Sequence, residues 1–286
     1  MNRITNLYRL PIQSRIIILS YYVFIVLRCK PTNIQKERNT IYNSLIHIDG
    51  KIIDETKELF KIKFKKTNQI AIIRKNPSSD LNVFNQVFRD NEYAKVIELF
   101  KANFTFSKLN IVDAGANVGY TSLLFNNHFS DVSFIAIEPS DANFNILKEN
   151  IAINNINAKL IHGGVWSKNA YLNLVRDFRD LSDWAIRVEE SDAVTDIKAY
   201  SISEIIKDTN WKTIDILKMD IEGSEKKVFE KDSDTSFLKI TKCIAVEIHD
   251  EFDCRDAIYK VLNEYGFSLT NVGETTIGIN SNFIKK

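Results

Sequence analysis

The sequence predicts an α/β fold, in which a mostly parallel sheet of seven strands carries helices on both faces. Two observations support this fold class. Apolar stretches of strand length alternate with stretches of helical periodicity from residue 109 to the end of the chain, and a glycine turn follows the first of these strands. We expect an N-terminal extension over residues 1–75, made of an apolar helix and a small antiparallel sheet, and a catalytic domain over residues 76–286.

The expected extension is strongly basic and contains one very apolar segment. Residues 1–75 hold fifteen Lys or Arg and five Asp or Glu, a balance of +10, which leaves −9 for the remainder of the +1 chain. Residues 16–27 are almost entirely apolar, but they are too few to span a bilayer, which needs about twenty. No small-residue cleavage site follows, which argues against a signal peptide. We expect a helix that packs on the catalytic domain or on a partner, or that makes peripheral membrane contact through residues 15–28.

The rest of the extension is expected to form a short helical piece after Pro31 and then a small antiparallel sheet over about residues 45–75. Asp49 and Gly50 stand between alternating apolar residues, a pattern typical of a β-hairpin. His47 would lie inside this sheet as a structural side chain. Ser79 and Asp80 are expected to cap a helix with an apolar face, and a second helix is expected over residues 92–101.

From residue 109 the chain alternates strand and helix. The expected order is strand 109–113, helix from 119, strand 133–138, helix 141–154, strand 158–162, a looser stretch with strands at 171–175, 184–188 and near 197, helix from 201, strand 214–219, helix from 224, strand 243–248, helix from 256, and strands 266–270 and 276–279. The last two would close the sheet as an antiparallel edge. The series predicts parallel βαβ units.

The glycine turn decides which ligand to expect. A dinucleotide fingerprint requires G-x-G-x-x-G, whereas here Asp113 takes the first glycine position and Gly115 and Gly119 are four residues apart. A carboxylate suits a cationic ligand that lacks phosphate, which describes S-adenosylmethionine. Glu138 ends the second strand and can accept hydrogen bonds from both ribose hydroxyls. An NAD-type oxidoreductase and a non-catalytic nucleotide-binding domain are the alternatives.

Four separated blocks resemble the FkbM family of S-adenosylmethionine-dependent methyltransferases: V-D-A-G-A-N-V-G-Y-T-S, F-I-A-I-E-P-S-D-A-N-F-N-I-L-K-E-N-I-A-I-N-N, D-I-L-K-M-D-I-E-G-S-E and A-V-E-I-H. The resemblance covers about residues 74–279. It implies a Rossmann-like class I methyltransferase fold. For the family, it implies O-methylation of a hydroxyl on a sugar, a polysaccharide or a polyketide-like product.

The predicted cofactor site follows the ends of the first three strands. Its members are expected to hold the methionine part, the ribose and the adenine, in that order: Asp113, Gly115, Ala116, Asn117, Gly119, Tyr120 and Thr121; Glu138 and Pro139; Val165 and Trp166. The backbone N–H groups of the turn and the following helix N-terminus would face the carboxylate of the cofactor. Val165 or Trp166 would lie against the adenine ring.

The acceptor site is expected at the ends of the fourth and fifth strands. Residues two apart on a strand point the same way, so Glu247 and His249 can face one pocket. We expect His249 to act as general base, because its ordinary pKa suits the task, with Asp220 or Glu222 positioning the acceptor. A divalent cation held by Asp220, Glu247 and His249 is an alternative, but no ligand spacing demands a metal and none is predicted.

Partners and setting are only broadly predicted. The acceptor is expected to be a hydroxylated small molecule or glycan. A nucleic-acid substrate is not expected, because the N/D-P-P-Y-type block of amino-group methyltransferases is replaced by D-I-E-G. Three cysteines form no metal or disulfide pattern, which favours a reduced, cytoplasmic setting, with membrane association as a further option. The residues fix neither the acceptor nor the oligomeric state.

Overall fold

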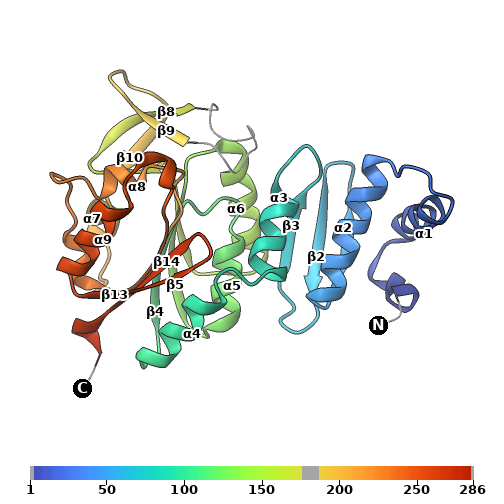
Figure 1. Ribbon diagram of the computed structural model, residues 1–286, viewed down its shortest axis with the longest axis horizontal. Helices are drawn as coiled ribbons and strands as arrows, with labels where there is room; N and C mark the ends of the chain where they lie inside the picture. Colours follow the sequence, from blue (N-terminus) through green and yellow to red (C-terminus); the bar gives the residue numbers. More distant parts are fainter. Residues whose placement is uncertain (1–2, 176–186, 285–286) are drawn as a thin grey trace. The chain divides into compact units, whose positions relative to one another are not determined.

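The computed structural model describes residues 3–175 and 187–284, and the chain divides into two units, Met1–Glu92 and Tyr93–Lys286 (Figure 1). The boundary expected at residues 75 and 76 stays a prediction. Helix α3 (Asp80–Phe84), which the sequence assigned to the catalytic domain, lies in the first unit. Each unit is described by itself below.

The first unit contains two long helices and a three-stranded sheet. Its elements are the 3₁₀ helix η1 (Arg3–Arg9), α1 (Ile12–Val26), α2 (Asn33–His47), β1 (Gly50–Glu55), β2 (Leu59–Phe64), β3 (Ile70–Arg74), α3 and the π-helical turn η2 (Asn85–Arg89). The strands pair antiparallel in the order β1-β2-β3. The expected apolar helix and small antiparallel sheet are therefore confirmed.

Two local predictions in this unit are wrong. Asp49 and Gly50 form no hairpin turn, because α2 continues to His47 and Asp49, with a φ of 52°, joins that helix to β1. His47 is thus the last residue of a helix rather than part of the sheet. Ser79 makes no side-chain cap to α3, and the Asp80 carboxylate accepts hydrogen bonds from the backbone N–H and guanidinium of Arg74 at 2.6–3.2 Å instead.

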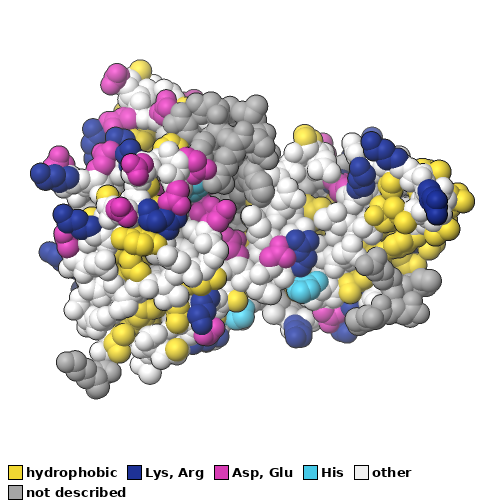
Figure 2. All heavy atoms as spheres, viewed as in Figure 1, with side chains coloured by type: hydrophobic (Ala, Val, Ile, Leu, Met, Phe, Trp, Pro, Cys, Tyr) yellow, Lys and Arg dark blue, Asp and Glu magenta, His cyan; other side chains and the backbone are white. Residues whose placement is uncertain are grey.

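Helix α1 exposes apolar side chains along one side. Ile18 and Ser14 are buried, while Ile12, Ile16 and Val26 are 72%, 62% and 80% exposed. Figure 2 shows hydrophobic side chains gathered over this helix, with Lys and Arg side chains among them. Within residues 3–175 and 187–284, none of the helices combines the length and the apolar character that crossing a bilayer requires.

The second unit is built around the seven-stranded sheet predicted from the sequence. Its strands are β4 (Leu109–Ala114), β5 (Val132–Glu138), β6 (Ala158–His162), β11 (Ile214–Met219), β12 (Thr241–Glu247), β13 (Phe267–Val272) and β14 (Thr275–Asn280). The order is β13-β14-β12-β11-β4-β5-β6, in which the five from β12 to β6 are parallel and β13 and β14 form the antiparallel edge. Both the sheet and its antiparallel edge are confirmed.

Helices cover both faces of this sheet. They are α4 (Ala94–Asn103), α5 (Tyr120–His128), α6 (Asp141–Ile153), α7 (Ile202–Lys207), α8 (Glu225–Val228) and α9 (Arg255–Glu264). Figure 1 shows α4, α5 and α6 on one face and α7, α8 and α9 on the other. The central strand β11 is buried at every position, as a strand covered on both faces must be.

The looser stretch after β6 forms a sheet of its own, which the sequence did not predict. It pairs β7 (Gly164–Val165), β10 (Ile197–Tyr200), β8 (Ala170–Val175) and β9 (Arg187–Ser191) in that order. The predicted strands at 171–175 and near 197 are confirmed. Of the strand expected at 184–188, residues 184–186 lie outside the described residues.

The sheet has a topological switch point between β4 and β11. From β4 the chain proceeds to β5 and β6 on one side, and later to β11 and β12 on the other. The two connections leave the carboxyl ends of β4 and β11 in opposite directions, and ligands of open α/β sheets bind at such a point.

Candidate active site

The glycine turn after β4 lies directly against the end of β11. Gly115 and Gly119 have φ values of 75° and 88°. A Cβ on Gly115 would overlap the backbone carbonyl oxygen of Asp220, and a Cβ on Gly119 would lie 2.7 Å from the side chain of Leu147. Gly115 is therefore required by a contact with backbone inside the protein, not only by the approach of a ligand, whereas Gly119 is favoured by its positive φ, since the Leu147 side chain could move. The first turn of α5 follows, with Tyr120 and Thr121 buried.

Asp113 lies beneath this turn and is fully buried. One oxygen of its carboxylate accepts a hydrogen bond from the Ser122 hydroxyl at 2.7 Å, and the other lies 3.6 Å from the Lys218 ammonium. Lys218 also donates to the carbonyl oxygen of Gly115 at 2.6 Å and lies 3.7 Å from Asp220. Asp113 thus fixes the turn through a buried ion pair, and its expected contact with the cofactor stays a prediction.

Glu138 connects the ends of β4 and β5. Its carboxylate accepts hydrogen bonds from the backbone N–H groups of Asn117 and Ser140, both at 2.9 Å. Burial raises the pKa of Glu138, and the hydrogen bonds from these donors lower it because they favour the charged form. Burial has the larger effect, and the pKa is raised to about 7. Pro139 follows, and its carbonyl oxygen lies 3.1 Å from Nε2 of His162. Asn117 and Glu138, predicted from separate blocks, therefore meet at the ends of two neighbouring strands, and the expected contact of Glu138 with the ribose stays a prediction.

Val165 and Trp166 follow β6 but lie in different surroundings. Val165 is buried in the main core with Val112 and Ile137. Trp166 packs in the core of the four-stranded sheet with Leu172, and its indole N–H donates to Glu190 at 3.2 Å. The adenine contact expected of these two residues stays a prediction.

Four carboxylates surround the imidazole of His249. The register pairs Met219 of β11 with Val246 of β12, so Asp220 and Glu247 follow at neighbouring strand ends. Nε2 of His249 lies 3.3 Å from Glu222 and 3.8 Å from Glu247. On the other side of the ring, Nδ1 lies 3.3 Å from Glu225. The structure thus brings together all four residues predicted for the acceptor site.

The charge on His249 differs from the one expected of a general base. Burial lowers its pKa, but the hydrogen bonds to Glu222 and Glu225 outweigh burial and raise the pKa to about 11. At neutral pH the ring therefore carries its second proton and has no lone pair to accept another. The general-base role expected of His249 stays a prediction, and it requires that this proton leave first.

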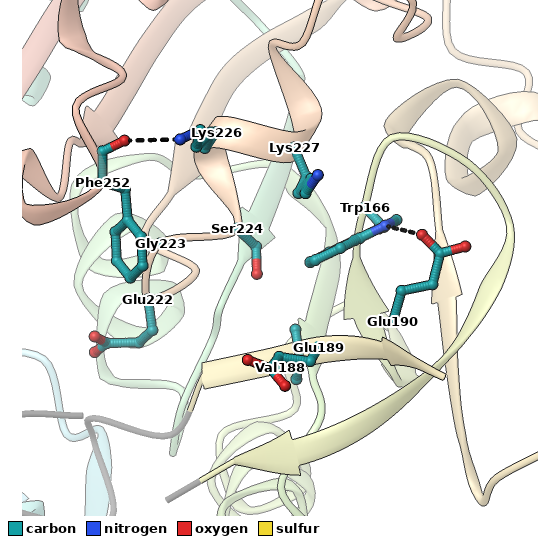
Figure 3. A pocket seen from close by; sticks show the side chains of 10 residues that line it. All are labelled: Trp166, Val188, Glu189, Glu190, Glu222, Gly223, Ser224, Lys226, Lys227 and Phe252. Carbon is teal, nitrogen blue, oxygen red and sulfur yellow. Dashed lines mark hydrogen bonds between the residues drawn. The ribbon is translucent and has the colours of Figure 1, made fainter. Parts of the chain in front are cut away.

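A pocket of about 270 Å³ opens beside this cluster (Figure 3). Its wall combines aromatic, acidic and basic side chains, and Figure 3 shows those of Glu222, Ser224, Trp166 and Phe252 around it. The Ser224 hydroxyl is buried and has no hydrogen-bond partner among the described residues. A bound molecule with polar groups would satisfy it.

Three residues to which the sequence assigned no role complete the site. Lys218 connects the turn to the cluster, Glu225 holds the far side of His249, and Ser224 faces the pocket. Glu222 stands in the turn before α8, with a φ of 53°, and Glu225 is the first residue of that helix. Their approach to one imidazole therefore depends on the path of this turn, which the spacing in the sequence does not indicate.

Comparison with known proteins gives consistent matches. Residues 113–269, more than half of the chain, match a family model described as the methyltransferase FkbM domain. The methyltransferase sdnD from Sordaria araneosa is 24% identical over 192 residues, which cover 56% of this chain and 74% of that protein. A METTL16 methyltransferase domain has a TM-score of 0.45 at 11% identity, covering 86% of this chain and 78% of its own. Precorrin-6y C5,15-methyltransferase from Geobacter metallireducens has a TM-score of 0.38 at 12% identity, covering 65% and 86%.

Proposed function

The chain belongs to the family described as the methyltransferase FkbM domain and is an S-adenosylmethionine-dependent methyltransferase, and we propose that it methylates a hydroxyl group of a sugar, a polysaccharide or a related natural product. The observation that carries the proposal is the contact between the two halves of the site. The glycine turn touches Asp220 through Gly115, so a methyl donor in the turn lies next to the carboxylate cluster.

The residues of the first half fit the cofactor. The first turn of α5 offers the backbone N–H groups that begin a helix, and Glu138 offers an acceptor for ribose hydroxyls at the end of β5. When bound, the cofactor supplies a methyl group on a positively charged sulfur. Carboxylates close to the turn, Asp113 and Asp220 among them, favour a cation there.

The residues of the second half fit a hydroxylated acceptor. Trp166 and Phe252 offer apolar surfaces on which a sugar ring can pack, and Ser224 offers a hydroxyl for hydrogen bonding. An acceptor hydroxyl that reached the cluster would give its proton to a carboxylate there, and its oxygen would receive the methyl group that the bound cofactor supplies. Placing the two reactants in line supplies much of the rate enhancement.

Transfer of a labelled methyl group tests the proposal. We expect turnover with glycans that carry free hydroxyls and none with RNA. One of the carboxylates is expected to accept the proton, so at least one of the variants Asp220→Asn, Glu222→Gln and Glu247→Gln should lower kcat by a factor of about 10²–10⁴. Asp232→Asn, on an exposed turn, is the control of equal charge change. Methylation of RNA but of no glycan contradicts the proposal. Calorimetry with adenosylhomocysteine and NAD separates it from an oxidoreductase.

We also propose that α1 binds an anionic membrane surface. The exposed residues Ile12, Ile16, Leu19, Val23 and Val26 fall within one side of the helix. Residues 1–36 contain six Lys or Arg and no Asp or Glu, so this part of the chain complements anionic lipid in charge. An exposed apolar stripe on a helix that basic residues flank in the sequence fits the interface of an anionic membrane.

Vesicle co-sedimentation of the full chain tests this contact. We expect binding to phosphatidylserine vesicles that weakens with salt and is lost in Ile16→Asn/Val23→Asn, while Val194→Asn, which changes an equally exposed apolar residue of the other unit, binds as the parent does. Absence of vesicle binding, with a dimer seen by light scattering that the double substitution dissolves, would show instead that a second copy covers the stripe.

A further inference from the structure

We propose that Asp220, Glu222 and His249 form a binding site for a divalent first-row transition-metal ion such as Mn²⁺. One ligand atom from each of these residues lies within 4.8 Å of the other two. Around an ion with bonds of about 2.1 Å, neighbouring ligand atoms are roughly 3–3.5 Å apart. Rotations that move the side chains by about 1 Å would therefore complete the three-residue set.

The charges around His249 support an additional cation. Four carboxylates, from Asp220, Glu222, Glu225 and Glu247, converge on one imidazole. The nearby Lys218 is shared between Asp220 and the buried Asp113. Acidic groups gathered in a partly buried site repel one another unless cations offset them, and a divalent ion brings two charges to the point where Glu222 and Glu247 face the same ring nitrogen.

Glu225 gives His249 the carboxylate partner that metal-binding histidines usually have. It is fully buried, one of its oxygens lies 3.3 Å from Nδ1 of His249, and the other accepts the backbone N–H of Ile221 at 2.8 Å. A histidine that binds a metal through one nitrogen usually donates from the other to a carboxylate, which fixes the ring. Glu225 is thus a positioning residue, and Nε2 is the nitrogen that faces the metal. The ion would bind there by displacing the second proton of the ring to solvent, as metals do when they bind histidine.

The open side of the site faces the pocket. Glu222 is part of the pocket wall, next to the Ser224 hydroxyl, which is buried without a hydrogen-bond partner among the described residues (Figure 3). This hydroxyl is an independent sign that a ligand enters beside the cluster. An ion held by three side chains keeps coordination positions for water or for an acceptor oxygen from the pocket.

The ligand types favour a transition metal over calcium or magnesium. One imidazole nitrogen with two carboxylates suits Mn²⁺, Fe²⁺ or Zn²⁺, whereas Ca²⁺ and Mg²⁺ prefer oxygen ligands alone. If the proposed function holds, this ion would lie beside the acceptor and acidify its hydroxyl as a Lewis acid. Metal binding itself does not depend on the identity of the acceptor.

Metal titration of the full chain tests the site without any acceptor. After treatment with EDTA and dialysis, MnCl₂ is titrated by calorimetry, and free Mn²⁺ is followed by electron paramagnetic resonance. We expect one equivalent to bind the parent, at least tenfold weaker binding by Glu222→Gln, and about 10–100-fold weaker binding by Glu225→Gln. Asp253→Asn removes a charge four residues from His249, at an exposed left-handed position that Asn tolerates, and should bind as the parent does.

Two results would overturn the proposal: the absence of Mn²⁺ binding by the parent, or equal binding by the parent and Glu222→Gln. Thermal melting in EDTA shows that each variant is folded. Because these measurements use no methyl donor, a failure of methyl transfer to hydroxyls leaves them unaffected. If adenosylhomocysteine binds and metal does not, the carboxylates serve the cationic cofactor instead.

Discussion

Glu138 gives the sharpest test of the predicted cofactor site, because protonation of its carboxylate should weaken binding of the ligand. Its pKa is raised to about 7 by burial. If ribose binding requires the carboxylate, the competent fraction falls from about ten elevenths at pH 8 to about one eleventh at pH 6. The affinity for adenosylhomocysteine should then fall roughly tenfold, or about 1.4 kcal/mol, over this range.

Glu138→Gln should remove both the affinity and its pH dependence. Hydrogen bonds to a charged group contribute about 1.5–3 kcal/mol each, so the loss of one such bond predicts at least tenfold weaker binding at pH 8. Calorimetric titration with adenosylhomocysteine at pH 6, 7 and 8 and constant ionic strength measures both effects. Glu264→Gln, at an exposed position of α9, is the matched control.

The same proton should act in the opposite direction on the stability of the ligand-free fold. Because the pKa of Glu138 is higher in the folded state than its ordinary 4.5, its protonated form favours folding. This contribution is complete below pH 4.5 and is lost as the pH rises through 7, about 3 kcal/mol in all. A binding profile that is flat with pH in the parent, or equally steep in Glu138→Gln, would refute the assignment of Glu138 as the ribose ligand.

Three further predictions concern stability and are checked by chemical denaturation. Gly115→Ala should lower the free energy of unfolding by about 3 kcal/mol or more, because the added Cβ overlaps a backbone carbonyl at positive φ. Gly273→Ala, at positive φ in open space, should lower it by about 1 kcal/mol, and equal losses would contradict the steric argument. Asp80→Ala should lower the free energy of unfolding by about 3–5 kcal/mol, because it removes the buried carboxylate that accepts hydrogen bonds from the backbone N–H and guanidinium of Arg74. Asp90→Ala, from an exposed pair, should change the free energy of unfolding by less than about 1 kcal/mol. Lys218→Met should cost about 3–5 kcal/mol, and an unchanged midpoint would show that its two carboxylate partners do not need it.

Much of the second unit could be predicted, because the spacing of its apolar residues and the residues of its turns indicate the same strands and helices. The central strands, such as β11, are continuous apolar runs, and the glycine turn after β4 identifies the switch point. Their order in the sheet follows from parallel βαβ connections. The four-stranded sheet was not predicted, because β7 and β10 have only two and four residues, and β10 pairs with β7 and β8, which are not its neighbours in the sequence.

Errors in the first unit arose where two patterns overlap. Ile46, Ile48 and Ile52 alternate as a hairpin would, yet the first belongs to the last turn of α2 and the last to β1. The start of α2 could have been predicted from Thr32 and Gln35, which form a capping box.

The sequence could predict which residues come together at the candidate site, but not the charge of His249 or the role of each residue. The sequence places acids at the ends of β11 and β12, so their meeting at His249 follows from the topology. Whether the imidazole there is neutral depends on how closely Glu222 and Glu225 approach it, which only coordinates reveal. Likewise, the sequence suggested that Gly115 makes room for a ligand, while the structure shows Asp220 against it.

The backbone contact between Gly115 and Asp220 constrains how this enzyme could acquire a new substrate. In the proposed assignment, the turn that holds the methyl donor and the segment that holds the acceptor touch at this point. A loop taken from another enzyme to bind a different acceptor would then have to reproduce the main-chain path at the Asp220 carbonyl before any of its side chains could act. Redesign of substrate specificity should therefore start at Trp166 and Phe252 in the pocket wall, because these side chains can be changed without altering the contact between Gly115 and Asp220.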